Sequence, residues 1–399
     1  MNRSPIPYHI MAKPTGAICN LDCAYCFFLS KESLYPESNF RMSDEVLKNY
    51  IKQYVQSQPN NEVMITWQGG EPTLMGIEFF EKATRYANQF KRPHQRVSFA
   101  IQTNGVLLDD DWGTFLNRNG YLVGISIDGP EHLHDTYRRD KGGKPTFRRV
   151  IAGLDALKKH RVEYNILCTV NAENGDHPLD IYHFFRDELK AEYIQFIPIV
   201  ERQNETGFQA GDRVTERSVR PAQWGTFLNT IFDEWIKRDV GRVFIPTFES
   251  ALANWYGVPA GICVFNETCG SALALEHNGD LYACDHYVEP NYLLGNIAER
   301  PMAEMLMSEQ QQTFGQAKKD ALPQYCLDCD VRFACHGECP KNRFIKTPDG
   351  EEGLNYLCEG YKAFFTHIDA PMKFMTNELR AQHSPARVMT HFKKTNGMK

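Results

Sequence analysis

The sequence predicts an α/β fold in which a partial parallel barrel precedes a smaller domain rich in cysteine. Three observations support this prediction. Apolar runs typical of buried strands alternate with amphipathic stretches typical of helices through the first 240 residues. Polar turns that contain glycine follow three of the predicted strands. Eight of the twelve cysteines fall after residue 260.

The alternation starts with a predicted strand at 62–67 (EVMITW) and a predicted helix at 76–90. The later predicted strands are 96–101, 122–127, 163–170 and 193–200, and the later predicted helices are 109–119, 146–160, 178–190 and 221–239. Because parallel strands are joined by right-handed crossovers, this order predicts a parallel sheet. The number of units falls short of eight, so we expect a partial, (β/α)6 TIM-like barrel.

Length and composition limit the classes of function. The 399 residues fit two or three structural units, and 42% hydrophobic against 24% charged residues excludes global disorder. The net charge of −6 provides no overall basic field, so nucleic acid and anionic membranes are poor candidate partners. The N-terminus does not match a signal peptide, and no apolar run reaches 18 residues. We therefore expect a cytoplasmic protein.

The composition changes after residue 240, where cysteines and short turns replace the long alternating units. We place the barrel at 1–240, the cysteine-rich domain at 241–370 and a basic tail at 371–399. Within the second domain, HNGDLYAC (277–284) predicts a hairpin that leads into a cysteine. For the tail, a solvated or frayed helix is the simpler interpretation, and a docking arm for an acidic partner is the alternative.

Three polar turns lie at the carboxyl ends of predicted strands, which is the edge where parallel α/β folds bind ligands. Any one of them is explained equally well by the need for Gly, Asn and Asp in tight turns. Three on one edge favour a ligand site. The turns are Gln68-Gly69-Gly70-Glu71-Pro72, Gln102-Thr103-Asn104-Gly105 and Ser126-Ile127-Asp128-Gly129-Pro130.

The cysteines fall into a group of three, a single residue and a group of eight. In a reducing compartment this many cysteines indicate metal ligation before disulfides. Eight thiolates complete two closed sites, whereas three leave one position open, as a catalytic site requires. A zinc loop or redox thiols are the alternative for the group of three. Cys168, inside the apolar run NILCTV, is predicted to be a core thiol.

Cys19-x3-Cys23-x2-Cys26, followed by the GGEP turn, resembles the radical S-adenosylmethionine (SAM) superfamily. The resemblance implies that these thiolates hold a [4Fe-4S] cluster whose fourth iron binds SAM, and that one-electron reduction yields a 5′-deoxyadenosyl radical. Gly69 and Gly70 would let the backbone approach the methionine ammonium, with the Glu71 carboxylate balancing its charge. The other candidate SAM-binding residues are Gln68, Gln102, Asn104, Ser126 and Arg138. For Arg138, an ordinary surface arginine is an equal alternative.

The later cysteines resemble the SPASM extension of peptide-modifying radical SAM enzymes, which holds two auxiliary [4Fe-4S] clusters. The pattern is Cys269-x9-Gly279-x4-Cys284, then Cys326-x2-Cys329-x5-Cys335-x3-Cys339, and finally Cys358. By this resemblance, one cluster is held by Cys263, Cys269, Cys284 and Cys339, and the other by Cys326, Cys329, Cys335 and Cys358. Spacing alone does not establish that Cys339 belongs to the first of these sets and Cys358 to the second.

Most of the chain resembles the anaerobic sulfatase-maturating enzymes. The resemblance is carried by MAKPTGAICNLDCAYCF, WQGGEPTL, IQTNGVLL, GISIDGP, YACDHY, LGNI and LNYLCEGY. It implies an oxidoreductase with SAM and three [4Fe-4S] clusters that converts a Cys or Ser of an unfolded or nascent sulfatase polypeptide to Cα-formylglycine. It also implies a flavodoxin- or ferredoxin-type reductant.

Asp285 follows Cys284 and matches the general base proposed for this family. The alternative is a carboxylate that caps a turn. Phe28 departs from the family, because some members have tyrosine there. Two other functions stay open at this point, namely a radical SAM/SPASM enzyme that forms thioether or carbon–carbon crosslinks in another peptide, and a non-catalytic zinc-binding module.

Overall fold

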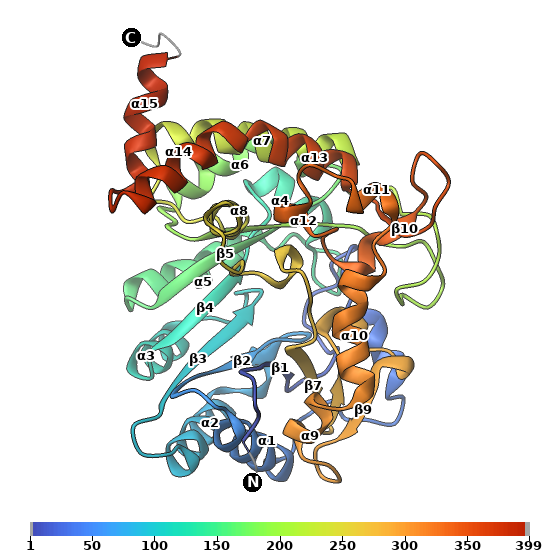
Figure 1. Cartoon of the computed structure of the whole chain (residues 1–399). Coiled ribbons are helices and arrows are strands. Elements are labelled where there is room, and N and C mark those ends of the chain that lie inside the picture. The colour runs from blue at the N-terminus through green and yellow to red at the C-terminus, as the bar shows by residue number, and fades with distance from the viewer. Residues whose placement is uncertain (1–2, 396–399) are drawn as a thin grey trace.

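The computed structural model describes residues 3–395. Its main sheet has nine strands in the order β6-β5-β4-β3-β2-β1-β7-β8-β9. The strands of the barrel are β1 (His9–Lys13), β2 (Glu62–Trp67), β3 (Arg96–Thr103), β4 (Tyr121–Ser126), β5 (Glu163–Val170) and β6 (Ile194–Pro198). Each pairs in parallel with its neighbour. The predicted partial α/β barrel is confirmed, with six parallel strands that fan across the molecule in Figure 1.

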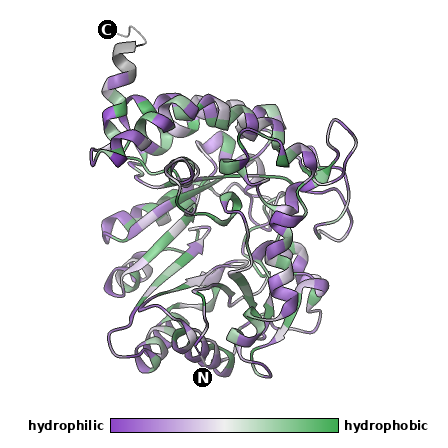
Figure 2. Ribbon diagram, in the orientation of Figure 1, coloured by the Kyte–Doolittle hydropathy of each residue, from purple (hydrophilic) through white to green (hydrophobic). Residues whose placement is uncertain are grey.

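Helices cover the outside of these strands because each has one apolar stripe. In α2, the buried positions Phe79, Phe80, Ala83 and Ala87 repeat with helical spacing. Figure 2 shows the same division, with hydrophilic colour concentrated on the outer helices and hydrophobic colour along the strands. The helices of this part are α1 (Asp44–Ser57), α2 (Ile77–Phe90), α3 (Asp110–Arg118), α4 (Glu131–Tyr137), α5 (Phe147–Lys159), α6 (Pro178–His183), α7 (Pro221–Arg238) and α8 (Pro246–Tyr256).

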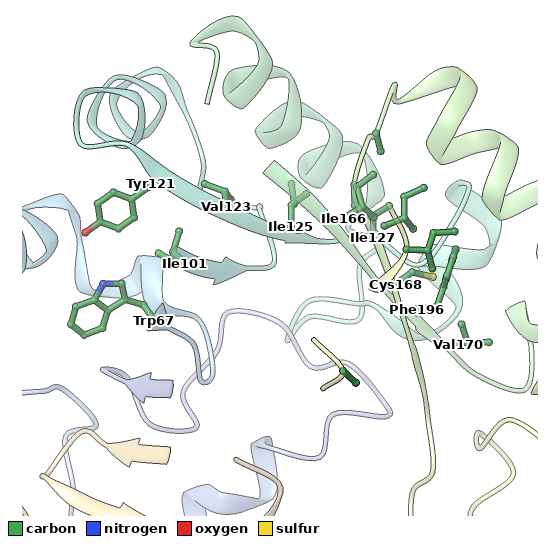
Figure 3. Close-up of a cluster of buried hydrophobic side chains, with 14 of the residues drawn as sticks. Trp67, Ile101, Tyr121, Val123, Ile125, Ile127, Ile166, Cys168, Val170 and Phe196 are labelled. Atoms are coloured by element: carbon green, nitrogen blue, oxygen red, sulfur yellow. The ribbon is translucent and has the colours of Figure 1, made fainter. Parts of the chain in front are cut away.

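The core of the barrel is formed by apolar side chains from consecutive strands. Trp67, Ile101, Val123 and Ile166 are each at most 1% exposed, and Figure 3 shows them in a continuous layer. Cys168 lies in the same cluster beside Phe196 and is 0% exposed. The prediction that Cys168 is a core thiol is therefore confirmed.

Strand β1 was not among the predicted strands, and it changes the position of the first cysteine loop. We expected that loop to precede the first strand, but it follows β1 at its carboxyl end. β1 pairs with β2 on one side and with β7 (Ala272–Glu276) on the other, in parallel with both. The sheet of the barrel therefore continues directly into the cysteine-rich part of the chain.

That part contains the predicted hairpin, which is present as β7 and β8 (Asp280–Tyr282) in antiparallel pairing, followed by β9 (Leu293–Asn296). Its other elements are α9 (Met302–Leu306), α10 (Glu309–Asp320), α11 (Gln324–Leu327), α12 (Arg332–Cys335), α13 (Cys358–His367) and the two-stranded sheet of β10 (Arg343–Ile345) and β11 (Leu354–Asn355). The boundaries at 240 and 370 stay predictions.

The segment predicted as a basic tail forms two packed helices, α14 (Asp369–Arg380) and α15 (Val388–Thr395). α14 packs against α8, and α15 against α7. Met372, Met375 and Val388 are 0% exposed, so apolar burial holds the segment in place and corrects the expectation of a frayed or solvated end. Of its basic residues, Lys399 and the side chains of Lys393 and Lys394 lie outside the described part.

Candidate active site

The first cysteine loop lies at the carboxyl end of β1 and is held by backbone hydrogen bonds to the last residue of α4 and to the segment that follows it. Asp22 N donates to Arg139 O at 2.8 Å, and Ala24 N donates to Tyr137 O at 3.1 Å. Cys19, Cys23 and Cys26 are all partly buried free thiols. Burial raises the pKa of Cys19 to about 12 and that of Cys23 to about 11. Because burial disfavours the charged thiolate, these thiols need a nearby positive charge to lose their protons, and bound iron would supply it.

The Gly69-Gly70 turn packs backbone to backbone against this loop. Gly70 N donates to Gly16 O at 2.8 Å, and a Cβ atom on Gly70 would lie 2.0 Å from the carbonyl oxygen of Ile18. Gly69 has φ +126°, which side chains rarely allow. Both glycines are therefore required by the approach of the two loops, in addition to the ligand approach expected from the sequence.

Glu71 stabilises the turn from inside. Its carboxylate is 0% exposed and accepts hydrogen bonds from Thr73 N (3.0 Å), Thr73 Oγ1 (2.6 Å), Thr103 Oγ1 (2.8 Å) and Asn104 N (2.8 Å). Burial raises the pKa of Glu71, and these donors oppose that shift. The structure thus shows the carboxylate joining the turns after β2 and β3, a role that the sequence did not reveal. Its expected part in balancing the methionine ammonium stays a prediction.

The remaining predicted residues lie on the same edge of the sheet. Gln102 Nε2 donates to Ser126 Oγ at 3.0 Å, which joins the ends of β3 and β4. Asn104 Nδ2 donates to Asn20 Oδ1 at 2.7 Å and contacts Cys19 Sγ at 3.6 Å. The three polar turns after β2, β3 and β4 and the first cysteine loop after β1 therefore lie at one edge of the sheet, as the prediction of a site there requires.

Arg138 is not a surface arginine, which excludes that alternative. It is 6% exposed, and its Nη1 donates to the hydroxyl of Tyr25 at 2.9 Å, while Tyr25 donates to Asp128. Tyr25 lies between two of the loop cysteines, so this chain of contacts links the cysteine loop to the turn after β4. Sequence reasoning did not identify Tyr25 or Asp128 as partners of Arg138.

Several buried polar atoms at this edge have no protein partner. They include Gln68 Oε1, Arg138 Nε and Thr15 Oγ1. A buried polar atom without a partner is costly, so such atoms indicate a site completed by a ligand. Three thiols, unpaired polar atoms and close-packed glycines fit a cluster that binds SAM.

Asp285 lies where the cysteine-rich part meets this edge. It is 6% exposed and forms an ion pair with Lys13, the last residue of β1, which is 1% exposed. Burial alone would raise the pKa of Asp285, but the charges of Lys13 and His286 outweigh it and lower the pKa. Lys13 Nζ also lies 4.1 Å from the centre of the Phe28 ring.

Lys13 was missed because its partner is distant in the sequence. The only local signal is a lysine at the end of the short run HIMAK, directly before the cysteine loop. A small apolar cluster also joins the two parts here, with Ala17 and Phe28 packed against Ala274, Tyr282 and Val288. Asp285 is therefore fixed between the first cysteine loop and a predicted cluster ligand.

The other eight thiols interact electrostatically in two groups. Burial raises the pKa of Cys284, and the neighbouring Cys339 and Cys263 add to that shift, whereas the pKa of Cys358 is raised by burial and then by Cys326 and Cys329. Each of these pairs of neighbours falls within one of the two ligand sets implied by the resemblance. In the described part of the chain, no three His, Cys, Asp or Glu side chains converge to hold a single metal ion. A four-iron cluster needs a wider arrangement, because each thiolate binds its own iron.

Comparison with known proteins identifies the family. The model of the Radical SAM superfamily matches residues 14–185, and that of an iron-sulfur cluster-binding domain, SPASM, matches residues 263–330. A serine-type anaerobic sulfatase-maturating enzyme of Bacteroides thetaiotaomicron is 47% identical over 397 residues, which is 97% of this chain and 95% of that protein. The chain belongs to the anaerobic sulfatase-maturating enzymes.

Comparisons with two other sulfatase-maturating enzymes support this membership. A cysteine-type enzyme of Clostridium perfringens is 33% identical over 94% of this chain and 100% of its own length. The structure of native anSMEcpe with bound AdoMet and Cp18Cys peptide matches with a TM-score of 0.84 and 31% identity, covering 94% of this chain and 100% of that one.

Membership of the sulfatase-maturating enzymes makes the chain a radical SAM oxidoreductase with an iron–sulfur domain, which excludes the zinc-module alternative. Among the described residues, no helix has the length and apolar character needed to cross a membrane.

Proposed function

We propose that this chain oxidises a serine or cysteine side chain of a sulfatase polypeptide to Cα-formylglycine without oxygen. The observation that carries the proposal is the position of Asp285, a buried carboxylate paired with Lys13 between the first cysteine loop and Cys284. The higher identity to a serine-type relative, 47% against 33% for a cysteine-type one, favours serine as the better substrate.

The residues present fit three clusters, held by the three sets of cysteines predicted above, or about twelve irons in all. When bound, these groups and SAM supply the radical that takes a hydrogen atom from Cβ, and the acceptor for the remaining electron. Gln68, Gln102, Asn104, Ser126 and Arg138 would hold SAM at the edge of the sheet. We propose a flavodoxin- or ferredoxin-type reductant and, from the predicted use of the cysteines as reduced ligands, a cytoplasmic location.

Asp285 would accept the proton of the substrate hydroxyl or thiol. A serine side chain loses two hydrogens in becoming an aldehyde, one as a hydrogen atom from Cβ and the other as a proton with one electron left behind. A general base must be ionised and near the proton it takes. Lys13 meets the first requirement by lowering the pKa of Asp285, and the packing of Phe28 against Lys13 holds the pair in place.

Anaerobic turnover with two peptides tests the proposal. The peptides carry the same sulfatase motif and differ only in Ser or Cys at the target position. We expect 5′-deoxyadenosine from SAM and, by mass spectrometry, loss of one hydrogen pair from the serine peptide. The cysteine peptide should exchange its CH2SH group for CHO after hydrolysis. If the reduced, cluster-loaded enzyme cleaves SAM but changes neither peptide, the proposal is wrong.

A further inference from the structure

Helix α10 has a buried face that is polar rather than apolar. Its buried residues are Gln311, Gly315 and Lys318, which share one face at helical spacing. An ordinary amphipathic helix buries aliphatic side chains. The reason why polar side chains are buried on this face must therefore lie in the groups that they contact.

Two of these residues, Gln311 and Gly315, contact the backbone beside Cys269 and Cys284. Gln311 Nε2 donates to Gly270 O at 2.7 Å and to Ala283 O at 3.1 Å. Cys269 N donates to Gly315 O at 3.2 Å, and a Cβ atom on Gly315 would lie 2.4 Å from Cys269 O. The helix is thus packed directly against the loops that carry these cysteines.

Lys318 completes the face. Its Nζ donates to the carbonyl oxygens of Cys263 (2.7 Å), Val264 (2.9 Å) and Asn266 (2.5 Å). An ammonium has three N–H donors, whereas a neutral amine has two, so three accepting carbonyls match the charged form. The residue is 1% exposed.

A buried ammonium is stable only with compensating negative charge. None of the described carboxylates lies within ion-pair distance of Lys318. The three carbonyl oxygens that Lys318 Nζ contacts belong to the segment from Cys263 to Asn266. Cys263 is itself a predicted cluster ligand, and Cys269, another ligand of the same set, follows three residues after Asn266. The cluster that this set would hold is therefore the source of negative charge that the position of Lys318 indicates.

We propose that Lys318 balances the charge of the auxiliary cluster held by Cys263, Cys269, Cys284 and Cys339, and so raises the reduction potential of that cluster. The reduced cluster carries one more negative charge than the oxidised cluster, and a fixed cation beside it stabilises the reduced form more. This makes Lys318 a positioning residue for electron acceptance. The inference rests on the proposed function for the presence and ligands of this cluster.

The test is an anaerobic redox titration of the reconstituted holoenzyme, followed by electron paramagnetic resonance. It compares the native chain with Lys318→Met, which removes the charge, Lys318→Arg, which keeps it, and a matched control. The control is Lys319→Met, because Lys319 is the next residue of α10 but is 47% exposed at its side chain and pairs with Glu267 on the surface.

We expect Lys318→Met to lower the midpoint potential of one auxiliary cluster and to leave the other two clusters unchanged. Lys318→Arg should shift that potential less, and Lys319→Met should match the native chain. An unchanged potential in Lys318→Met with all irons present would overturn the proposal. So would loss of the cluster in both Lys318 variants, because Lys318 would then only maintain the shape of the loop.

Loss of the cluster in Lys318→Met alone, with retention in Lys318→Arg, would support the need for the charge. None of these readouts uses a peptide. A chain that shows the expected shift but modifies no sulfatase peptide would therefore keep the inference and refute the proposed function. Absence of any auxiliary cluster from the native chain would refute both.

Discussion

Replacing Lys13 by Met is expected to destabilise the protein strongly, because it leaves the Asp285 carboxylate buried without its cation. Lys13 and Asp285 are 1% and 6% exposed, so water does not take over the role of the missing ammonium. Removing one partner of a buried pair typically costs about 3–5 kcal/mol of unfolding free energy. Methionine preserves most of the volume, so loss of packing adds little.

This cost can be expressed as a change in melting temperature. Unfolding entropies near 2.1 cal/mol/K per residue give about 0.8 kcal/mol/K for a chain of 399 residues that unfolds as a unit. The expected decrease is therefore about 4–6 °C. Lys346→Met is the control, because Lys346 and Glu352 form a pair with side chains 66% and 70% exposed. Such a pair is worth less than about 1 kcal/mol.

The pH dependence supplies a second check. In the native chain Lys13 lowers the pKa of Asp285 below its unfolded value, so its contribution to stability is present above that value and lost only in acid. In Lys13→Met the larger of the two charges that oppose burial is gone, so burial raises the pKa of Asp285 relative to the native chain. Stability is then lost as pH rises through the folded pKa. The difference between the two proteins should therefore grow as pH rises above the unfolded pKa of a carboxyl group, and be larger at about pH 8 than at about pH 5.

The assay is anaerobic thermal unfolding of the cluster-loaded proteins at one scan rate, followed by circular dichroism. Lys13→Met should also make less aldehyde per 5′-deoxyadenosine, because its base is no longer held ionised. A melting temperature no lower than that of Lys346→Met, at both pH values, would show that the pair does not stabilise the fold and would refute this reasoning.

Three further predictions concern the same site. Asp285→Asn should lower aldehyde formation by about 10²–10⁴-fold while 5′-deoxyadenosine is still made, as mass spectrometry and chromatography would show; an equal loss of both products would contradict its role as the base. Gly70→Ala should weaken SAM binding in equilibrium titrations at least about tenfold, or about 1.4 kcal/mol, because its Cβ atom would lie 2.0 Å from a backbone oxygen. The control is Gly142→Ala, at an exposed glycine, which should bind SAM like the native chain. Iron analysis should show a loss of about four irons in Cys284→Ala and none in Cys168→Ala, and equal iron contents would disprove the predicted division of the thiols.

The strands and helices that the sequence predicted well are those with long local patterns. The strand at 163–170 has the predicted bounds, and the helix predicted at 76–90 differs from α2 by one residue. Both follow from apolar periodicity within a single window. By contrast, β1 has five residues, two prolines shortly before it and a lysine at its end. It is a strand because β2 and β7 pair with it, and no local pattern reveals such partners.

The residues of the site also fall into those that local sequence patterns predicted and those that they did not. The thiols and the Gly69-Gly70 turn were predictable because their chemistry requires particular residue types at short spacing. The partners of Lys13, Arg138 and Lys318 were not, because each contact joins segments far apart in the chain. For Lys318, no helix was predicted over 309–320, and the meaning of its polar face depends on the loops packed against it.

The position of β1 has a consequence for how the protein is made. β1 is complete once the first 13 residues have been synthesised, but its second neighbour, β7, ends at Glu276. Until the ribosome has released that segment, one edge of β1 stays without its partner, and Lys13 stays without the carboxylate of Asp285. Contacts at such sequence separation form late, because a long loop must close first. The surroundings of the first cysteine loop are therefore completed only after Asp285 has left the ribosome, and we expect stable loading of iron there to follow that point.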